Sequence, residues 1–322
     1  MSRSKRNAAA EEYFRRAPNY SADAIPDLSE RVRWHQKKGN GEAASLYEYV
    51  VEKLEAAHKF SLPEGGLLFA ETRGWMLNGQ RPPFPVSAFE FLLGSTPQSG
   101  VFMGGSKTAK VKREIVLSVR EEPLTILFPI IETDGGWQLP LWFPMLHDEE
   151  TVFYGPGEAP AGTRFHGPED ARERGFITVG IKFHRLGEPA KQLIDEYGLD
   201  EAEINRRAMR GSFHSISAYA QACAALSCTN VSTEVIRPNR EARAARPAST
   251  LFDYHVLMID PGREHPPGEA LGGTHASPRT HLRRGHIRRL AWGPRVWVNS
   301  CVVNPSAIGT VNKDYAVRPV NH

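Results

Sequence analysis

Glycine and proline recur along the middle of this 322-residue chain, and they limit it to short structural elements. The sequence holds 28 Gly and 24 Pro, and both residue types interrupt helices while favouring turns. A helical bundle is therefore disfavoured, and many short strands joined by turns are expected. At this length the chain can bury a sizeable core, as one large domain or as two of ordinary size.

The N-terminal stretch, residues 1–65, has a helical pattern. Between Glu42 and His58, apolar residues recur at three- and four-residue spacing, which predicts one amphipathic helix. Asn40 is suited to the start of this helix and Pro63 to its end. We expect the stretch to contribute packing and not a functional site.

The middle stretch, residues 66–210, alternates between strand-like runs and turns. The expected strands are Gly66–Ala70, Arg113–Val119, Leu124–Ile131, Trp137–Phe143 and Phe176–Phe183. Asp134-Gly135-Gly136 lies between two apolar runs and predicts a hairpin turn. Two helices are expected next, Pro189–Tyr197 and Asp200–Met209, and the second begins with a capping-box pattern.

The third stretch, residues 211–322, predicts a helix packed on an antiparallel sheet. The helix is expected at roughly Ser215–Ser227, where the sequence is rich in Ala and apolar on one side. Four strand-like runs with short links suggest antiparallel pairing: Tyr254–Ile259, Thr280–Leu290, Arg295–Val303 and Asp314–Val320. With N-terminal helices, a strand-rich middle and this C-terminal unit, the fold class expected is α+β.

The sequence also bears on the cellular compartment. No apolar run approaches the roughly 20 residues that a membrane-spanning helix needs, and the basic N-terminus lacks the apolar core of a secretory signal. Cys223, Cys228 and Cys301 show no CxxC spacing, and their odd number argues against a disulfide framework. We therefore expect a soluble protein of the cytoplasm with no membrane partner.

Basic charge is concentrated near the C-terminus. Between Val235 and Lys313 there are 12 Lys and Arg against 5 Asp and Glu, although the whole chain carries a formal charge of only +3. From Ala270 to Asn312 there are six arginines and no acidic residue. Such a local excess attracts anions, and a polyphosphate chain is the commonest partner of this kind. The alternative is a solvated basic face that acids from elsewhere in the fold balance.

Within that region, Gly272–Leu290 is the most informative segment. It reads GGTHASPRTHLRRGHIRRL and combines histidines and arginines at strand-like spacing. In a plain alternating strand, His281 would share a face with Arg283. The opposite face would then hold three other residues: Arg284, His286 and Arg288.

Gly285 favours a second arrangement, because a glycine inside a strand often marks a bulge that shifts the alternation by one residue. With a bulge there, Leu282 and Ile287 share one face, which we expect to be buried. The other face then collects four polar side chains: His281, Arg283, His286 and Arg288. Because only this version brings the apolar residues into register, we expect the bulge.

Histidines and arginines on one sheet face suit RNA or a ribonucleoprotein. Arginine pairs bidentately with phosphate, and histidine can stack on a base or transfer a proton near neutral pH. The expected anion-binding residues are Arg279, Arg283, Arg284, Arg288 and Arg289, with Trp292 and Tyr315 as aromatic neighbours that could stack on bases.

Two further interpretations use the same residues. A metal-independent ribonuclease needs a general base, a general acid and cations, and His281 and His286 would then be its catalytic pair. A protein-interaction module would instead dock the basic strand on an acidic partner. We expect no cofactor and no metal, because the arginines beside His281 and His286 would repel a cation and no carboxylate stands nearby.

The segment SPRTHLRRGHIRR, followed by RVWVNSCVVN, resembles the C-terminal signature of a family widespread in phages and other mobile elements. The typical form contains His-x-Arg-Arg-Gly-His, which residues 281–286 match in order, and then Trp, where this chain has Ile287. The resemblance covers about the last third of the chain and includes Asn230. The best-known relatives are similar to the type V-A anti-CRISPR proteins, which lower production of the CRISPR effector nuclease.

This resemblance implies a phage- or plasmid-encoded protein for counter-defence or host takeover. It would act in the host cytoplasm on an mRNA or a ribosome–nascent chain complex, or on a host or CRISPR protein. Most members of the family have no assigned activity.

Overall fold

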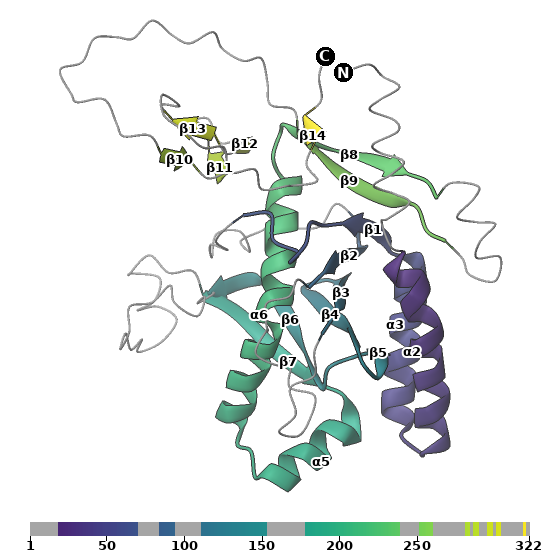
Figure 1. Ribbon diagram of the computed structural model, residues 1–322. Helices are drawn as coiled ribbons and strands as arrows, with labels where there is room; N and C mark the ends of the chain where they lie inside the picture. The colour runs from purple at the N-terminus through teal and green to yellow at the C-terminus, as the bar shows by residue number, and fades with distance from the viewer. Residues whose placement is uncertain are drawn as a thin grey trace, which may run out of the picture.

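The computed structural model describes residues 19–69, 84–93, 111–152, 178–238, 251–259, 281–283, 286–289, 295–298, 301–303 and 318–319. This part of the chain combines helices with a large mixed sheet (Figure 1). The α+β class expected from the sequence is therefore confirmed.

Ten strands form the central sheet. They are β1 His58–Ser61, β2 Val86–Leu92, β3 Arg113–Glu121, β4 Leu124–Thr133, β5 Gly136–Gln138, β6 Trp142–Val152, β7 Thr178–Arg185, β8 Val231–Ile236, β9 Tyr254–Ile259 and β14 Arg318–Pro319. The main path runs β14-β9-β1-β2-β3-β4-β6-β7, while β5 pairs with β4 and β8 pairs with β9. β1 is parallel to β2 and β9, whereas the pairs from β2 to β7 are antiparallel. Strands from all three stretches of the sequence thus join one sheet.

Helices cover both faces of this sheet (Figure 1). α2 (Tyr20–Lys37) and α3 (Gly41–Ala56) pack on one face, α6 (Glu201–Leu226) packs on the other, and α5 (Gly187–Tyr197) precedes α6. Neighbouring residues of β3 show the two-sided burial, since Ile115 packs with the α2–α3 layer and Val116 with α6. Because helices cover both faces, β2, β3 and β4 are buried at most of their positions, including polar ones such as Ser118 and Glu114.

The C-terminal half of α6 is buried around its whole circumference. Every residue from Ser215 to Ala225 is buried, and the many alanines allow close packing against the sheet on one side and other segments on the other. The sequence suggested two helices, at Asp200–Met209 and Ser215–Ser227, and that prediction is wrong. One helix runs through Gly211, because tertiary packing outweighs the modest cost of a glycine inside a helix.

Several expected elements are confirmed with small changes at their ends. β3, β4, β7, β9, α3 and α5 all lie where the sequence placed them, and Asp134-Gly135 forms the turn between β4 and β5. The expected run Trp137–Phe143 is divided between β5 and β6. In these segments the apolar pattern and the turn residues predict the same structure.

The strand expected at Gly66–Ala70 is wrong. Residues 66–69 are not in a strand, and Gly66 has a φ of 67°, a left-handed conformation that a strand does not contain. A Cβ at Gly66 would also lie 2.9 Å from the Phe91 ring. The strand in this region is β1, which begins at His58, immediately after α3.

Candidate nucleic-acid interface

The described site residues fall in two short antiparallel ladders. β10 (His281–Arg283) pairs with β13 (Cys301–Val303), and β11 (His286–Arg289) pairs with β12 (Arg295–Val298). We call these four strands the basic ribbon. It contains five of the expected site residues: His281, Arg283, His286, Arg288 and Arg289. The others lie outside the described residues: Arg279, Arg284, Trp292 and Tyr315.

Both ladders of the basic ribbon keep one register. Arg283 is opposite Cys301, and His286 is opposite Val298. Gly285 lies outside the described residues. The bulge expected there, and the shared face that it would give to His281, Arg283, His286 and Arg288, therefore stay predictions.

Ile287 is the residue of β11 that faces the core. It packs on the apolar cluster around α6 and lies opposite Trp297, which is only 8% exposed. The Trp297 ring lies 4.5 Å from the Phe69 ring, measured between centroids. Arg288, the next residue along β11, is exposed, as the alternation of side chains along a strand requires. β11 thus rests on the core and presents Arg288 to solvent.

Asn230 holds β12 against the turn that follows α6. The Trp297 backbone N–H donates to the Asn230 side-chain oxygen at 2.7 Å, and the Asn230 side-chain nitrogen donates to the Trp297 carbonyl at 2.9 Å. Next to it, the backbone N–H of Thr229 donates to the Arg295 carbonyl at 2.9 Å. One carboxamide therefore satisfies both backbone groups of a buried residue, as a neighbouring strand would.

Gln221 bonds in the same way to Phe69, the residue whose ring contacts Trp297 of the basic ribbon. The Phe69 N–H donates to the Gln221 side-chain oxygen at 2.7 Å, and the Gln221 side-chain nitrogen donates to the Phe69 carbonyl at 3.2 Å. Gln221 lies on α6 and is fully buried. A continuous series of contacts therefore joins α6 to Phe69, then to Trp297, and so to the basic ribbon.

Sequence reasoning missed these supporting residues. In the sequence, Asn230 stands out only as part of the segment that resembles the mobile-element family. Its position directly after an Ala-rich helix was the available signal, because an asparagine at a helix exit often bonds to nearby backbone. Gln221 had a signal as well, since it is a polar residue inside an otherwise apolar helical run.

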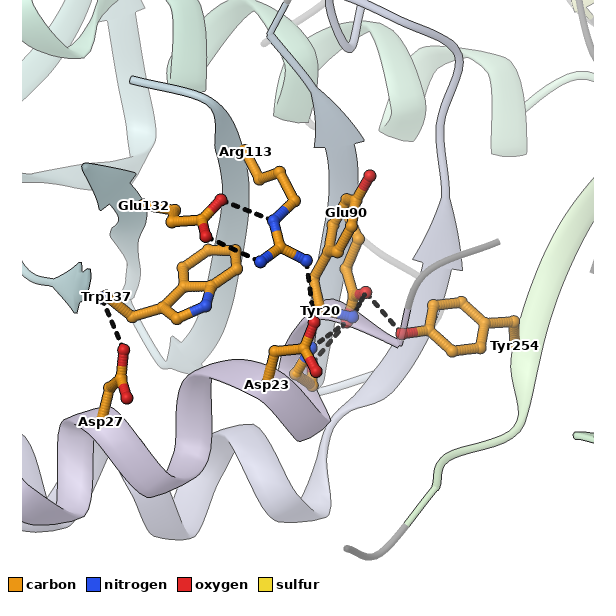
Figure 2. Close-up of polar contacts among 9 residues, drawn as sticks. Tyr20, Asp23, Asp27, Glu90, Arg113, Glu132, Trp137 and Tyr254 are labelled. Atoms are coloured by element: carbon orange, nitrogen blue, oxygen red, sulfur yellow. Dashed lines mark hydrogen bonds and ion pairs between the residues drawn. The ribbon is translucent and has the colours of Figure 1, made fainter. Parts of the chain in front are cut away.

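A second polar cluster lies where α2 meets the sheet (Figure 2). The Arg113 guanidinium donates to the Glu132 carboxylate at 2.6 and 2.7 Å and to Asp23 at 2.8 Å. It also lies over the rings of Tyr20 and Trp137, at 4.9 and 5.1 Å from their centroids. Each guanidinium nitrogen already donates to a carboxylate, so this arginine ties α2 to β3 and β4 and does not serve as an anion site.

Glu90 occupies the N-terminus of α2 in the same region (Figure 2). The backbone N–H groups of Tyr20 and Ser21 donate to its carboxylate at 3.0 and 3.2 Å, and the hydroxyls of Ser21 and Tyr254 donate as well. Burial raises the pKa of Glu90 to about 7, against the opposing effect of these hydrogen bonds. The carboxylate stabilises the positive end of the helix and joins α2, β2 and β9, so its role is structural.

Histidines outside the basic ribbon form a pair between β1 and β9. His58 Nδ1 and His255 Nε2 are 3.3 Å apart, and burial lowers the pKa of both rings. The Phe84 ring stacks on His58 at 3.6 Å. Among the residues that the structure describes, no group of three or more His, Cys, Asp or Glu side chains could hold a metal ion.

The chain was also compared with known proteins. No family model, no curated protein and no solved structure matches it. No helix in the described ranges is long and apolar enough to cross a membrane. Among the described residues of the basic ribbon, Arg288 is exposed on a strand whose neighbouring residue, Ile287, packs on the core.

Proposed function

We propose that this chain is an RNA-binding protein of a mobile element, and that the basic ribbon is its phosphate-binding surface. The observation that carries the proposal is the placement of β11. Ile287 packs on the core while Arg288 is exposed, so the strand has a fixed inner side and a cationic outer side. The signature at residues 281–286 supports a counter-defence or host-takeover role for the RNA binding.

The charge pattern of the ribbon favours a polyphosphate as its partner. Arg289 and Arg295 lie directly opposite each other in the β11–β12 register, and like charges at opposite positions destabilise a ladder. A phosphate bound beside them would offset that repulsion. The six arginines between Ala270 and Asn312 have no acidic residue among them in sequence, and arginine is the side chain best suited to bidentate phosphate contacts.

The test compares the RNA affinity of the wild type with that of a variant that lacks two arginines of the basic ribbon. Arg288→Ala with Arg289→Ala leaves Ile287 and its packing in place. A matched control removes two exposed cations of α2, Arg33→Ala with Lys37→Ala. We expect the ribbon variant to lose RNA affinity by about 10-fold or more and the slope of log affinity against log salt to fall by about 2, since each phosphate contact contributes about one unit. An equal affinity in the two variants would reject the proposal.

Recovery of the tagged protein from host cells distinguishes the other interpretations. RNA that is retained by the wild-type protein and lost from the ribbon variant supports the proposal. A single acidic protein that stays bound after nuclease treatment would instead favour a protein-interaction module. Cleavage of RNA in the presence of a metal chelator, if it disappears in His286→Ala, would identify a metal-independent ribonuclease.

A further inference from the structure

The large sheet has two edges that differ in their protection. β7 carries Lys182 and Arg185, and its pairing with β6 is interrupted between Leu146 and Thr151. Charged side chains and irregular pairing are features that keep an edge strand from pairing with another chain. β8 reads VSTEVI and contains no Lys, Pro or Gly. Its six residues pair with β9 in one uninterrupted register, and Glu234 is its one charged residue, so β8 is less protected than β7.

β8 is also exposed on both of its faces. Four consecutive residues, Ser232 to Val235, are exposed, and Val235 is 49% exposed. Four of the six residues are β-branched, which favours an extended strand. Among the described strands, β8 pairs with β9 alone. Within the described part of the chain, no strand pairs with the outer row of backbone N–H and C=O groups of β8, and such a row can accept a further strand.

We propose that β8 is the edge through which two copies of this chain pair. β8 of one copy would lie antiparallel to β8 of the other across a two-fold axis, which would join the two sheets into one. Such an axis passes perpendicular to the sheet and places one residue opposite its own copy, because residues that face each other must point to the same side.

The charge pattern of β8 selects the register. Centring the axis on Glu234 would oppose two carboxylates, which destabilises a ladder. Centring it on Thr233 opposes two threonines, and Ser232 then lies opposite Glu234. In this register Val231 of one copy lies opposite the exposed Val235 of the other, so apolar surface is covered at both ends and no like charges face each other.

A single pair of short strands buries less surface than a permanent dimer needs. We therefore expect a dimer that forms reversibly as concentration rises. It would carry two basic ribbons in one particle, and an RNA long enough to reach both would bind with avidity. The pairing itself needs no RNA, so it stands apart from the proposed function.

Sedimentation of the full chain over a range of concentrations, without RNA, tests this proposal. The wild-type protein should show a monomer–dimer equilibrium. Thr233→Lys and Thr233→Glu should each raise the dissociation constant about 10-fold or more, because two like charges then face each other at the axis. An equimolar mixture of the two variants should recover the dimer, since a lysine then faces a glutamate.

Gln36→Lys is the matched control, because it places the same charge on an exposed position of α2, and it should dimerise like the wild type. Thr233 is exposed, so its variants should keep the wild-type circular dichroism spectrum. A wild-type protein that stays monomeric at every concentration would overturn the proposal. So would a dimer that persists unchanged in Thr233→Lys, or variants that fail to pair when mixed.

Discussion

At the scale of single residues, three side-chain carboxamides bond to backbone N–H and C=O groups as a neighbouring strand would. Asn230 bonds to both backbone groups of Trp297, Gln221 does so for Phe69, and Asn19 accepts from and donates to Phe252 at 3.4 and 3.2 Å. Each joins a helix or its end to another segment: Phe69 and Phe252 lie outside strands, whereas Trp297 lies in β12. Buried backbone groups need partners, and these side chains supply them where no neighbouring strand does.

Asn230→Asp tests whether this device positions the basic ribbon. The aspartate can still accept from the Trp297 N–H, but it cannot donate to the carbonyl and places a negative charge beside it. We expect a loss of about 1–3 kcal/mol of local stability. Hydrogen exchange should become faster in β11 and β12 while the central strands stay protected, and RNA affinity should fall. Asn40→Asp is the control, because Asn40 precedes α3 and makes no side-chain cap bond. Unchanged exchange in β11 and β12 would contradict this role.

Glu114 gives a prediction about pH. It is fully buried and accepts a hydrogen bond from the Ser215 hydroxyl at 2.5 Å. Burial raises the pKa of Glu114 from 4.5 to about 7, against the opposing effect of Ser215. The folded state therefore holds a proton that the unfolded state has lost between pH 4.5 and 7, so this group's contribution to stability falls as pH rises through that window.

Glu114→Gln removes this titration and keeps the acceptor for Ser215. We expect the variant to match the wild type near pH 4 and to be more stable near pH 8, by on the order of 3 kcal/mol at most. Thermal unfolding at the two pH values measures the difference, with the exposed Glu48→Gln as control. A variant that is destabilised equally at both pH values would contradict the assignment.

At the scale of elements, the apolar pattern of the sequence predicts some strands and misses others for physical reasons. β3 and β4 were predictable because dense apolar residues and a hairpin turn coincide there. β2 was missed because it follows closely on prolines, including Pro85, which signal a turn. β8 was missed because it begins directly after the turn at Asn230, and its exposed residues show no apolar alternation.

The basic ribbon shows the same limit within the site. The strand-like runs Thr280–Leu290 and Arg295–Val303 predicted where its strands lie, and the bulge was inferred from Gly285 and the spacing of Leu282 and Ile287. Gly285 lies outside the described residues, so the bulge stays a prediction. What the sequence could not show is the partner strand: Trp297 lies opposite Ile287, and the sequence of one strand does not reveal its partner's register.

At the scale of the whole molecule, the C-terminal third depends on the N-terminal elements. β9 joins the sheet through β1, with Lys59 opposite Tyr254, and the Tyr254 hydroxyl donates to Glu90. The Lys59 ammonium also lies 3.7 Å from the centre of the Phe252 ring. Segments nearly 200 residues apart therefore share one core, a relation that local sequence patterns cannot show.

A fragment of residues 211–322 should consequently fail to fold alone. It would keep the C-terminal half of α6 and β9 but lose β1 and the strands on which α6 packs, leaving a large apolar surface exposed. Circular dichroism and proton NMR of the fragment should show an unfolded or aggregated chain, with the full chain as control. A fragment with dispersed amide signals and a cooperative thermal transition would show that the C-terminal third is independent.

The central claim is that the basic ribbon binds RNA, and the most direct measurement is RNA affinity as a function of salt. It compares the wild type, the ribbon variant Arg288→Ala/Arg289→Ala and the α2 variant Arg33→Ala/Lys37→Ala. We expect weaker binding and a shallower salt slope in the ribbon variant alone. Equal loss in the two variants, or no binding by the wild type, would contradict it.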